Sequence, residues 1–155
     1  MRKITIAEDA PSTASQANWL DLDAIAKIEL TSEDPNFPIE SAIATKGGSG
    51  WRAALPGRQT LRVVFDNPTP VRRIRLEFCE NETSRTQEFV LRWCRQRESF
   101  IEIVRQQWNF NPQGSTSEIE DYRVDLKGAS IVELIITPDI SSARAFASLK
   151  AWHLA

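Results

Sequence analysis

Short stretches in which apolar and polar side chains alternate constrain the fold of this chain more than any other feature. Successive side chains of a β-strand point to opposite faces, so alternation with a period of two predicts a half-buried strand. The period is regular in residues 61–66, 73–78, 89–94, 122–127 and 132–136, and less regular in residues 25–31, 100–107 and 148–154. A brief helical turn is expected within residues 20–28, before the first strand. We therefore expect about eight strands.

The connections between these stretches indicate the fold class. They contain Gly, Pro and Asn, and many short strands joined in this way are typical of an all-β fold, here an antiparallel β-sandwich of the jelly-roll type. With 155 residues, of which 41% are hydrophobic, the chain suits one domain over residues 1–155, with residues 1–18 as a loosely ordered N-terminal extension. A chain of this length buries about two thirds of its unfolded surface, so its core needs neither a metal nor a disulfide.

The lengths of the loops predict which end of the sandwich carries the function. If consecutive strands run antiparallel, the connections fall alternately at the two ends. One end then receives residues 32–59, 80–87, 108–120 and 138–147, and the other receives residues 67–71, 96–99 and 128–130 together with both termini. Binding residues concentrate on loops that a rigid scaffold positions. We call the first end the long-loop end and expect the functional surface there.

The residue inventory argues against catalysis. The chain has 1 histidine, which excludes a site built from two or more imidazoles. That residue, His153, lies close to the C-terminus, on the end opposite the long loops, where no second catalytic group is evident. Glu80, Glu82 and Glu118 could approach one another, but no spacing in the sequence demands the carboxylate pair of a glycosidase. We expect a protein that is not an enzyme.

Charge, apolar runs and cysteines bear on partners and compartment. Residues 51–105 hold 11 basic and 7 acidic residues, and the rest of the chain 8 and 14. Arginines on strands act either as cross-strand partners of glutamates or as a polyanion-binding face, and the overall balance predicts no nucleic-acid partner. No signal peptide or membrane span is evident, so a cytoplasmic protein is expected. Cys79 and Cys94 would lie at opposite ends of a hairpin, which predicts unbridged thiols.

Several segments resemble a known family. They read Pro38 to Ser41, Gly50-Trp51-Arg52-Ala53, Gln59 to Asp66, Val71 to Leu76, Arg85 to Leu91, and Ala147 to Trp152. Together they resemble the discoidin, or coagulation-factor C-type, domain, which is a galactose-binding-domain-like β-sandwich. The resemblance covers nearly the whole chain after about residue 25, mostly at core and turn positions. It implies a non-catalytic module that binds sugars, lipid head groups or proteins through the loops at one end.

The resemblance also raises a structural calcium. Sugar-binding members commonly use an Asp-Gly pair after the first strand and a carboxylate near the C-terminus. The corresponding residues here are Ile39-Glu40-Ser41-Ala42 and Lys150. Calcium takes six to eight oxygen ligands, and Glu40 with backbone carbonyls falls short of that number. We therefore expect neither a metal nor another cofactor.

The loop after residue 107 is the first candidate site. Trp108 and Phe110 alternate with Asn109 and Asn111, so an aromatic plane stands beside hydrogen-bonding amides, as a sugar ring requires. Alternatively, both aromatic side chains cap the end of the sandwich and are buried there. We expect Trp108, Asn109 and Asn111 to contact the ligand.

Two further loops add candidates. Asn81 and Arg85 lie in the loop before residue 89, where Arg85 could bind ligand or pair with Glu82. Arg144 shares the last long loop with Asp139 and could bind ligand or pair with that acid. Trp51 follows a glycine-rich run, but the resemblance implies that its side chain packs inward.

These observations predict a non-catalytic binding module whose ligand is a carbohydrate or a sugar-like molecule. The alternative is a protein–protein interaction domain of the same fold in a cytoplasmic complex. A sugar site should be a concave aromatic and amide pocket, whereas a protein interface should be a flatter apolar patch. No membrane partner is expected.

Overall fold

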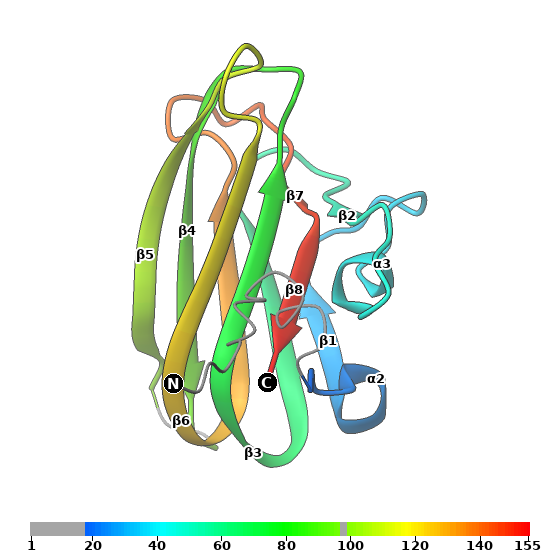
Figure 1. The fold of residues 1–155 in the computed structure, drawn as a ribbon, viewed down its shortest axis with the longest axis vertical. Coiled ribbons are helices and arrows are strands. Elements are labelled where there is room, and N and C mark those ends of the chain that lie inside the picture. Colours follow the sequence, from blue (N-terminus) through cyan, green and yellow to red (C-terminus); the bar gives the residue numbers. More distant parts are fainter. Residues whose placement is uncertain (1–17, 97–98) are drawn as a thin grey trace, which may run out of the picture.

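A computed structural model describes residues 18–96 and 99–155 (Figure 1). In chain order the elements are α2 (Leu22–Ile25), β1 (Ala26–Leu30), α3 (Glu40–Ile43), β2 (Trp51–Arg52), β3 (Gln59–Cys79), β4 (Arg85–Cys94), β5 (Ile101–Phe110), β6 (Ser117–Thr137), β7 (Ser148–Leu149) and β8 (Ala151–Leu154). This composition confirms the predicted all-β class. None of the described helices is long or apolar enough to cross a membrane. The predicted N-terminal extension, apart from residue 18, lies outside the described residues.

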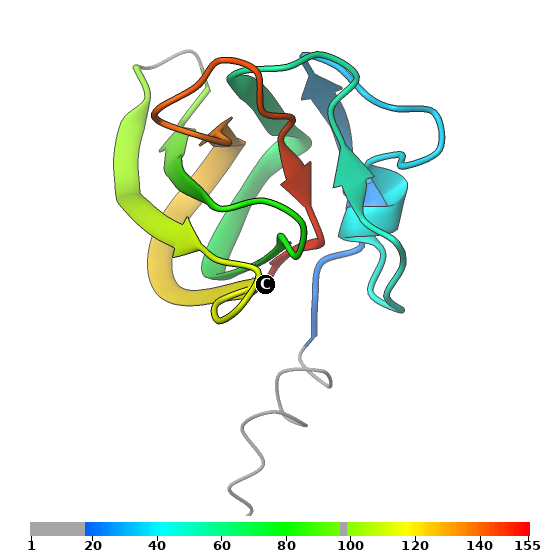
Figure 2. The same ribbon diagram turned by 90° about the horizontal axis from the view of Figure 1, so that it is seen from above.

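Six of the described strands form one hydrogen-bonded sheet that folds over itself into two layers, and β2 and β7 form a separate two-stranded sheet. The order of the six-stranded sheet is β1-β3-β6-β4-β5, and β8 adds to the second half of β3. Each of these pairings is antiparallel. The first half of β3 and the second half of β6 lie in one layer with β1, β4 and β5, while their other halves form the second layer with β8. Figures 1 and 2 show the resulting antiparallel sandwich.

Two predicted turns are bends within continuous strands. Residues 67–71 and 128–130 were expected to be connections, but β3 and β6 run through both segments without a break. The two strands stay paired across the bend, where Thr69 lies opposite Ala129 and the register shifts on either side of this pair. Gly128 has φ 75, a conformation that glycine adopts without steric cost, and it helps β6 to turn. Bulges let a strand change layers without losing its partner.

The expected hairpin that carries both cysteines is wrong. β4 pairs with β5 and β6 rather than with β3, because β6 occupies the position between β3 and β4. Cys79 is exposed at the end of β3 and Cys94 is buried at the end of β4, and neither forms a disulfide. The two thiols are thus unbridged, as predicted, although the predicted hairpin of β3 and β4 does not form.

The long loops after β3, β5 and β6 lie at one end of the sandwich, as predicted. The bends of β3 and β6 lie at the other end (Figure 1). The long segment after β1 runs alongside the sandwich and contains α3 and β2 (Figure 1). The predicted turn near residue 22 is α2, whereas α3 and β2 lie in a segment for which no regular element was predicted.

Large apolar side chains fill the space between the layers. The fully buried set includes Trp51, Trp152, Phe78, Phe89 and Leu134. Phe78 of one layer stacks on Phe89 of the other, with 5.4 Å between the ring centroids. Burial of each large apolar side chain stabilises the fold by about 2 kcal/mol, so the two layers are held together chiefly by this core.

A row of alternating charges crosses the outer face of the larger layer. In register order it runs Glu29 (β1), Arg62 (β3), Glu133 (β6), Arg92 (β4) and Glu102 (β5). Glu133 has 0% exposure although its side chain points away from the core. The Nε atoms of Arg62 and Arg92 each donate to one of its carboxylate oxygens at 2.7 Å. The interpretation of strand arginines as cross-strand partners is thereby confirmed for this row.

Removal of the central charge of this row should destabilise the sandwich. We expect Glu133→Gln to lower the free energy of unfolding by about 3 kcal/mol, because it leaves two neighbouring guanidinium groups without their shared counter-charge. Urea-induced unfolding measures the change. The matched control is Glu29→Gln at the exposed end of the row, for which a loss below about 1 kcal/mol is expected. Equal losses in the two variants would contradict a special role for Glu133.

Candidate functional site

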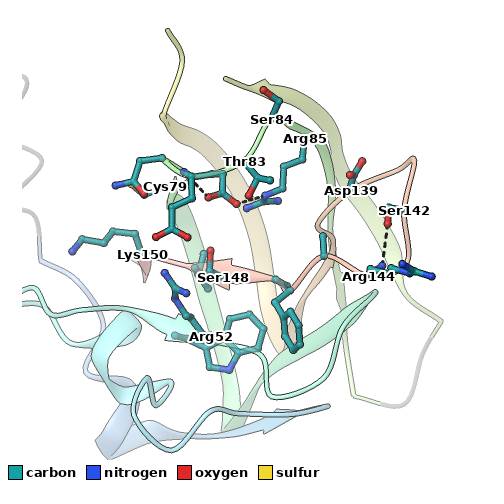
Figure 3. A pocket seen from close by; sticks show the side chains of 18 of the residues that line it. Arg52, Cys79, Thr83, Ser84, Arg85, Asp139, Ser142, Arg144, Ser148 and Lys150 are labelled. Atoms are coloured by element: carbon teal, nitrogen blue, oxygen red, sulfur yellow. Dashed lines mark hydrogen bonds and ion pairs between the residues drawn. The ribbon is translucent and has the colours of Figure 1, made fainter. Parts of the chain in front are cut away.

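The two-stranded sheet of β2 and β7 forms one wall of a pocket at the long-loop end. Trp51 lies opposite Leu149 and Arg52 opposite Ser148 in this sheet. Trp51 and Leu149 are buried in the core, as expected for Trp51, so the alternation of strand residues turns Arg52 and Ser148 outward. Figure 3 shows both outward side chains at the pocket.

The same alternation continues along the chain on both sides of β7. Ala147 and Leu149 are buried, whereas Phe146 and Lys150 are exposed. Phe146 is 53% exposed, which is unusual for a phenylalanine. Gly50 lets the two strands approach, because a Cβ at this position would lie 2.6 Å from the carbonyl oxygen of Leu149. One outward face therefore carries an aromatic ring, a hydroxyl and two cations.

Arg85 at the start of β4 ties together the loops that form the other walls. Its side chain is 3% exposed. Its Nε donates to Glu80 at 2.8 Å, and its NH1 donates to Gln87 and to the backbone carbonyl of Pro138. Its ion-pair partner is therefore Glu80, whereas the sequence had suggested Glu82. Because Glu80 and Pro138 begin two different loops, one buried guanidinium sets their separation.

Glu80 is charged for a local reason. Burial raises the pKa of its carboxyl, but the hydrogen bond from Arg85 and those from the backbone amides of Glu82 and Thr83 outweigh burial, and the pKa is lowered. The Glu82 amide lies 3.2 Å from a Glu80 carboxylate oxygen. Glu80 and Arg85 thus neutralise each other beneath the loop of residues 80–84.

These walls enclose a pocket of about 600 Å³, within the usual range for ligand sites. Of the residues proposed from sequence, Asn81, Arg85 and Arg144 line it. In Figure 3, Arg52, Ser148 and Lys150 lie along the β2–β7 wall, Thr83 and Arg85 face them, and Asp139, Ser142 and Arg144 close a third side. Among the described residues no ion pair joins Asp139 to Arg144, and the Asp139 carboxylate instead accepts from the Ser141 amide at 3.0 Å.

The other three proposed residues lie apart from this pocket. Trp108 is half-buried against the core, and its Nε1 donates to the Ser115 hydroxyl at 3.1 Å. Asn109 is exposed and accepts from the Thr86 hydroxyl at 2.6 Å. The side chain of Asn111 accepts from the Gln113 amide within its own turn. Neither Trp108 nor Asn109 is fully buried, so their predicted contact with a ligand remains a prediction.

Sequence reasoning missed Phe146, Arg52 and Ser148. One signal could have revealed them, because Phe146, Ser148 and Lys150 alternate with buried small and apolar residues in the order typical of a strand with one solvent-facing side. The pairing of this strand with residues 51–52 was not recognisable, since the two segments are separated by about a hundred positions.

A buried acid lies behind Arg85. Glu118 on β6 has 0% exposure, and one of its carboxylate oxygens has no hydrogen-bond partner among the described residues. Its other oxygen lies 3.4 Å from the amide nitrogen of Gln87. Burial, and then the neighbouring charge of Glu120, raise the pKa of Glu118 to about 8. Glu118 is therefore protonated at neutral pH.

The described residues do not assemble a metal centre. Among residues 18–96 and 99–155 there is no group of three or more His, Cys, Asp or Glu side chains that could hold a metal ion. Glu40 is exposed at the start of α3, and Glu33 accepts a hydrogen bond from the Ile39 amide at 2.6 Å. The ring of His153 lies 3.1 Å from the Ala44 carbonyl oxygen, and burial lowers the pKa of this histidine.

Glu118 predicts how stability depends on pH. The folded chain holds its proton up to about pH 8, whereas an unfolded glutamate releases it near pH 4.5. Stability should therefore fall as pH rises between these values, by at most about 1.4 kcal/mol per pH unit. Urea unfolding at several pH values should show a flatter dependence for Glu118→Gln, while Glu29→Gln keeps the wild-type slope. A wild-type slope in Glu118→Gln would refute this assignment.

Comparison with known proteins identifies the fold. No family model and no curated protein matches the sequence. The CBM32 module of AlyQ, solved with 4,5-unsaturated mannuronic acid, superposes with a TM-score of 0.61 at 18% identity, over 90% of this chain and 98% of the module. CpGH89CBM32-5 from Clostridium perfringens, solved with GalNAc-β-1,3-galactose, has a TM-score of 0.63 at 13% identity, over 88% and 99%.

A third similar structure is the family 32 CBM of C. perfringens NanJ in complex with galactose. It has a TM-score of 0.57 at 14% identity, over 88% of this chain and 96% of the module. At these identities the likeness concerns the fold. The protein thus has the galactose-binding-like β-sandwich fold of the CBM32 carbohydrate-binding modules, as the resemblance in its sequence implied.

Proposed function

We propose that this protein is a non-catalytic carbohydrate-binding module that holds a sugar in the pocket between the β2–β7 sheet and the loops of residues 80–84 and 138–147. The observation that carries this proposal is the exposed ring of Phe146, which lines the same pocket as Arg52, Ser148 and Arg144. Similar folds have been solved with mannuronic acid, galactose and GalNAc-β-1,3-galactose bound. Because a fold does not specify its ligand, the proposal depends on the residues that line the pocket.

The chemistry of the pocket suits a sugar ring. A pyranose has C–H groups on its faces and hydroxyl groups at its rim, and the negative face of an aromatic ring attracts the polarised C–H groups. Phe146 offers such a face. Ser148, Arg144 and Asp139 line the same pocket with groups that donate to or accept from hydroxyls. Charged hydrogen-bonding partners give this recognition its strength and direction.

The proposal includes no reaction and no calcium. Glu80 lines the pocket, but Arg85 holds its carboxylate charged, so it has no proton to donate. The raised pKa of Glu118 would suit an acid catalyst, but its side chain is buried behind Arg85 and does not line the pocket. We expect that EDTA will leave sugar binding unchanged.

Truncation of Phe146 should abolish binding. We expect Phe146→Ala to weaken the affinity for a bound sugar at least tenfold, because the stacking surface is lost, while the thermal stability changes little. Calorimetric titration with a panel of monosaccharides and disaccharides measures both the ligand and the effect. Ile101→Ala is the matched control, since Ile101 is 54% exposed but lies at the opposite end of the sandwich. Equal binding by Phe146→Ala and the wild type would overturn the proposed site.

Trp108 provides the competing prediction for the same titration. The sequence pointed to the aromatic and amide side chains of residues 108–111, which lie outside the pocket. If the sugar contacts that loop, Trp108→Ala loses binding and Phe146→Ala keeps it. We expect the reverse. If no sugar in the panel binds to the wild type, a protein–protein interaction domain becomes the better proposal, and pull-down from cell extract is the next measurement.

A further inference from the structure

We infer that the sugar held in this pocket is acidic, with its carboxylate bound between Arg52 and Lys150. This inference rests on the proposed function and adds the class of the ligand. The pocket is lined by four cations, Arg52, Arg85, Arg144 and Lys150. Glu80 neutralises Arg85, whereas the other three form no ion pair with any described carboxylate.

Arg52 is held in place without a counter-charge. Its guanidinium carbon lies 4.9 Å from the centroid of the Phe37 ring, and this cation–π contact restricts the side chain. In the β2–β7 sheet it stands directly opposite Ser148, whose hydroxyl lines the pocket. A guanidinium presents paired N–H groups that match the two oxygens of a carboxylate. Arg52 and Ser148 can therefore both donate to one carboxylate.

Lys150 adds the second charge on the same face of the sheet. Its Nζ donates to the carbonyl oxygen of Gly48 at 2.8 Å, which positions the ammonium group. An ammonium group has three donors, so two remain for a ligand. Arg52, Ser148 and Lys150 thus line one wall of the pocket (Figure 3), and we call these three residues the cationic cluster.

Phe146 lies two residues before Ser148, just ahead of β7, and both residues line the pocket. A pyranose ring stacked on Phe146 would extend toward Ser148, with an exocyclic carboxylate beside the cationic cluster. A carboxylate supplies the counter-charge that Arg52 and Lys150 lack, whereas a neutral hydroxyl offers only an uncharged hydrogen-bond acceptor. The charges of this wall therefore fit a uronic acid better than the neutral hexose of the same stereochemistry.

The acids of the pocket do not cancel these charges. Glu80 is paired with Arg85, and Asp139 accepts from the Ser141 amide on the far side of the pocket. Glu82 is exposed on the loop that faces the β2–β7 wall and forms no ion pair with any described cation. The negative charge of Glu82 would repel a ligand carboxylate bound at Arg52. Removal of the Glu82 charge should therefore favour an acidic ligand.

Matched sugar pairs test this inference. We propose calorimetric titration with galacturonate, glucuronate and mannuronate, each beside its neutral hexose and the methyl ester of the acid. At least one acid should bind about tenfold more tightly than its hexose and its ester, as expected for a charged hydrogen bond. Added salt should weaken the binding of the acid and leave the binding of the hexose unchanged, because the site is open to solvent and its charges are screened.

Substitutions test which residues cause the preference for the acid over its hexose. Arg52→Gln and Lys150→Gln should each remove most of the preference for the acid over its hexose, and Glu82→Gln should strengthen acid binding severalfold. The control is Arg72→Gln, an exposed arginine at the opposite end of the sandwich. If hexoses bind as tightly as their acids, or if the preference survives in Arg52→Gln and Lys150→Gln, the inference fails while the proposed function stands. If neither class binds, both fail.

Discussion

The pairing of β3 with β6 through both layers is the interaction on which the rest of the structure depends. The two strands are paired from Gln59 opposite Ile136 to Cys79 opposite Ser117, with register shifts where both bend between the layers. These irregularities lie beside Thr69 and Ala129, so both strands change layers at the same place and remain partners on either side. β1, β4 and β8 each add to one half of this pair, β5 adds to β4, and β2 pairs with β7 in a separate sheet. The loops at the open end of the β3–β6 pair are consequently held close to one another.

Two buried charged groups link the strands and loops that this pair holds together. Glu133 joins β3, β6 and β4 on the outer face, and Arg85 joins the loops after β3 and β6 at the pocket. In both cases a charge buried in the fold is surrounded by partners that satisfy it, which is the condition under which burial is tolerated. Glu118 departs from this rule, and it does so by keeping its proton. Charge pairing therefore determines local geometry, while the apolar core supplies most of the stability.

The sequence predicted more of the fold than of the site. Alternation located the main strands, and the antiparallel rule placed the long loops at one end. It could not show that residues 67–71 and 128–130 are bends, because a bulge within a strand and a short turn between strands have similar local sequences. It placed Arg85 and Arg144 at the pocket, but it singled out Trp108 for its aromatic character. Only the pairing of β2 with β7 shows that Phe146 occupies the pocket wall.

The sequence by itself determined which side chains face the core and which face outward, because the period of a strand is a local property of the backbone. The tertiary structure decided which outward faces meet. Arg52 and Ser148 become neighbours through a contact between segments far apart in the chain, and Glu80 meets Pro138 through the buried guanidinium of Arg85. Such contacts depend on the shared core and on how the two layers close over it. For that reason the binding pocket is a property of the folded chain rather than of any one of its motifs.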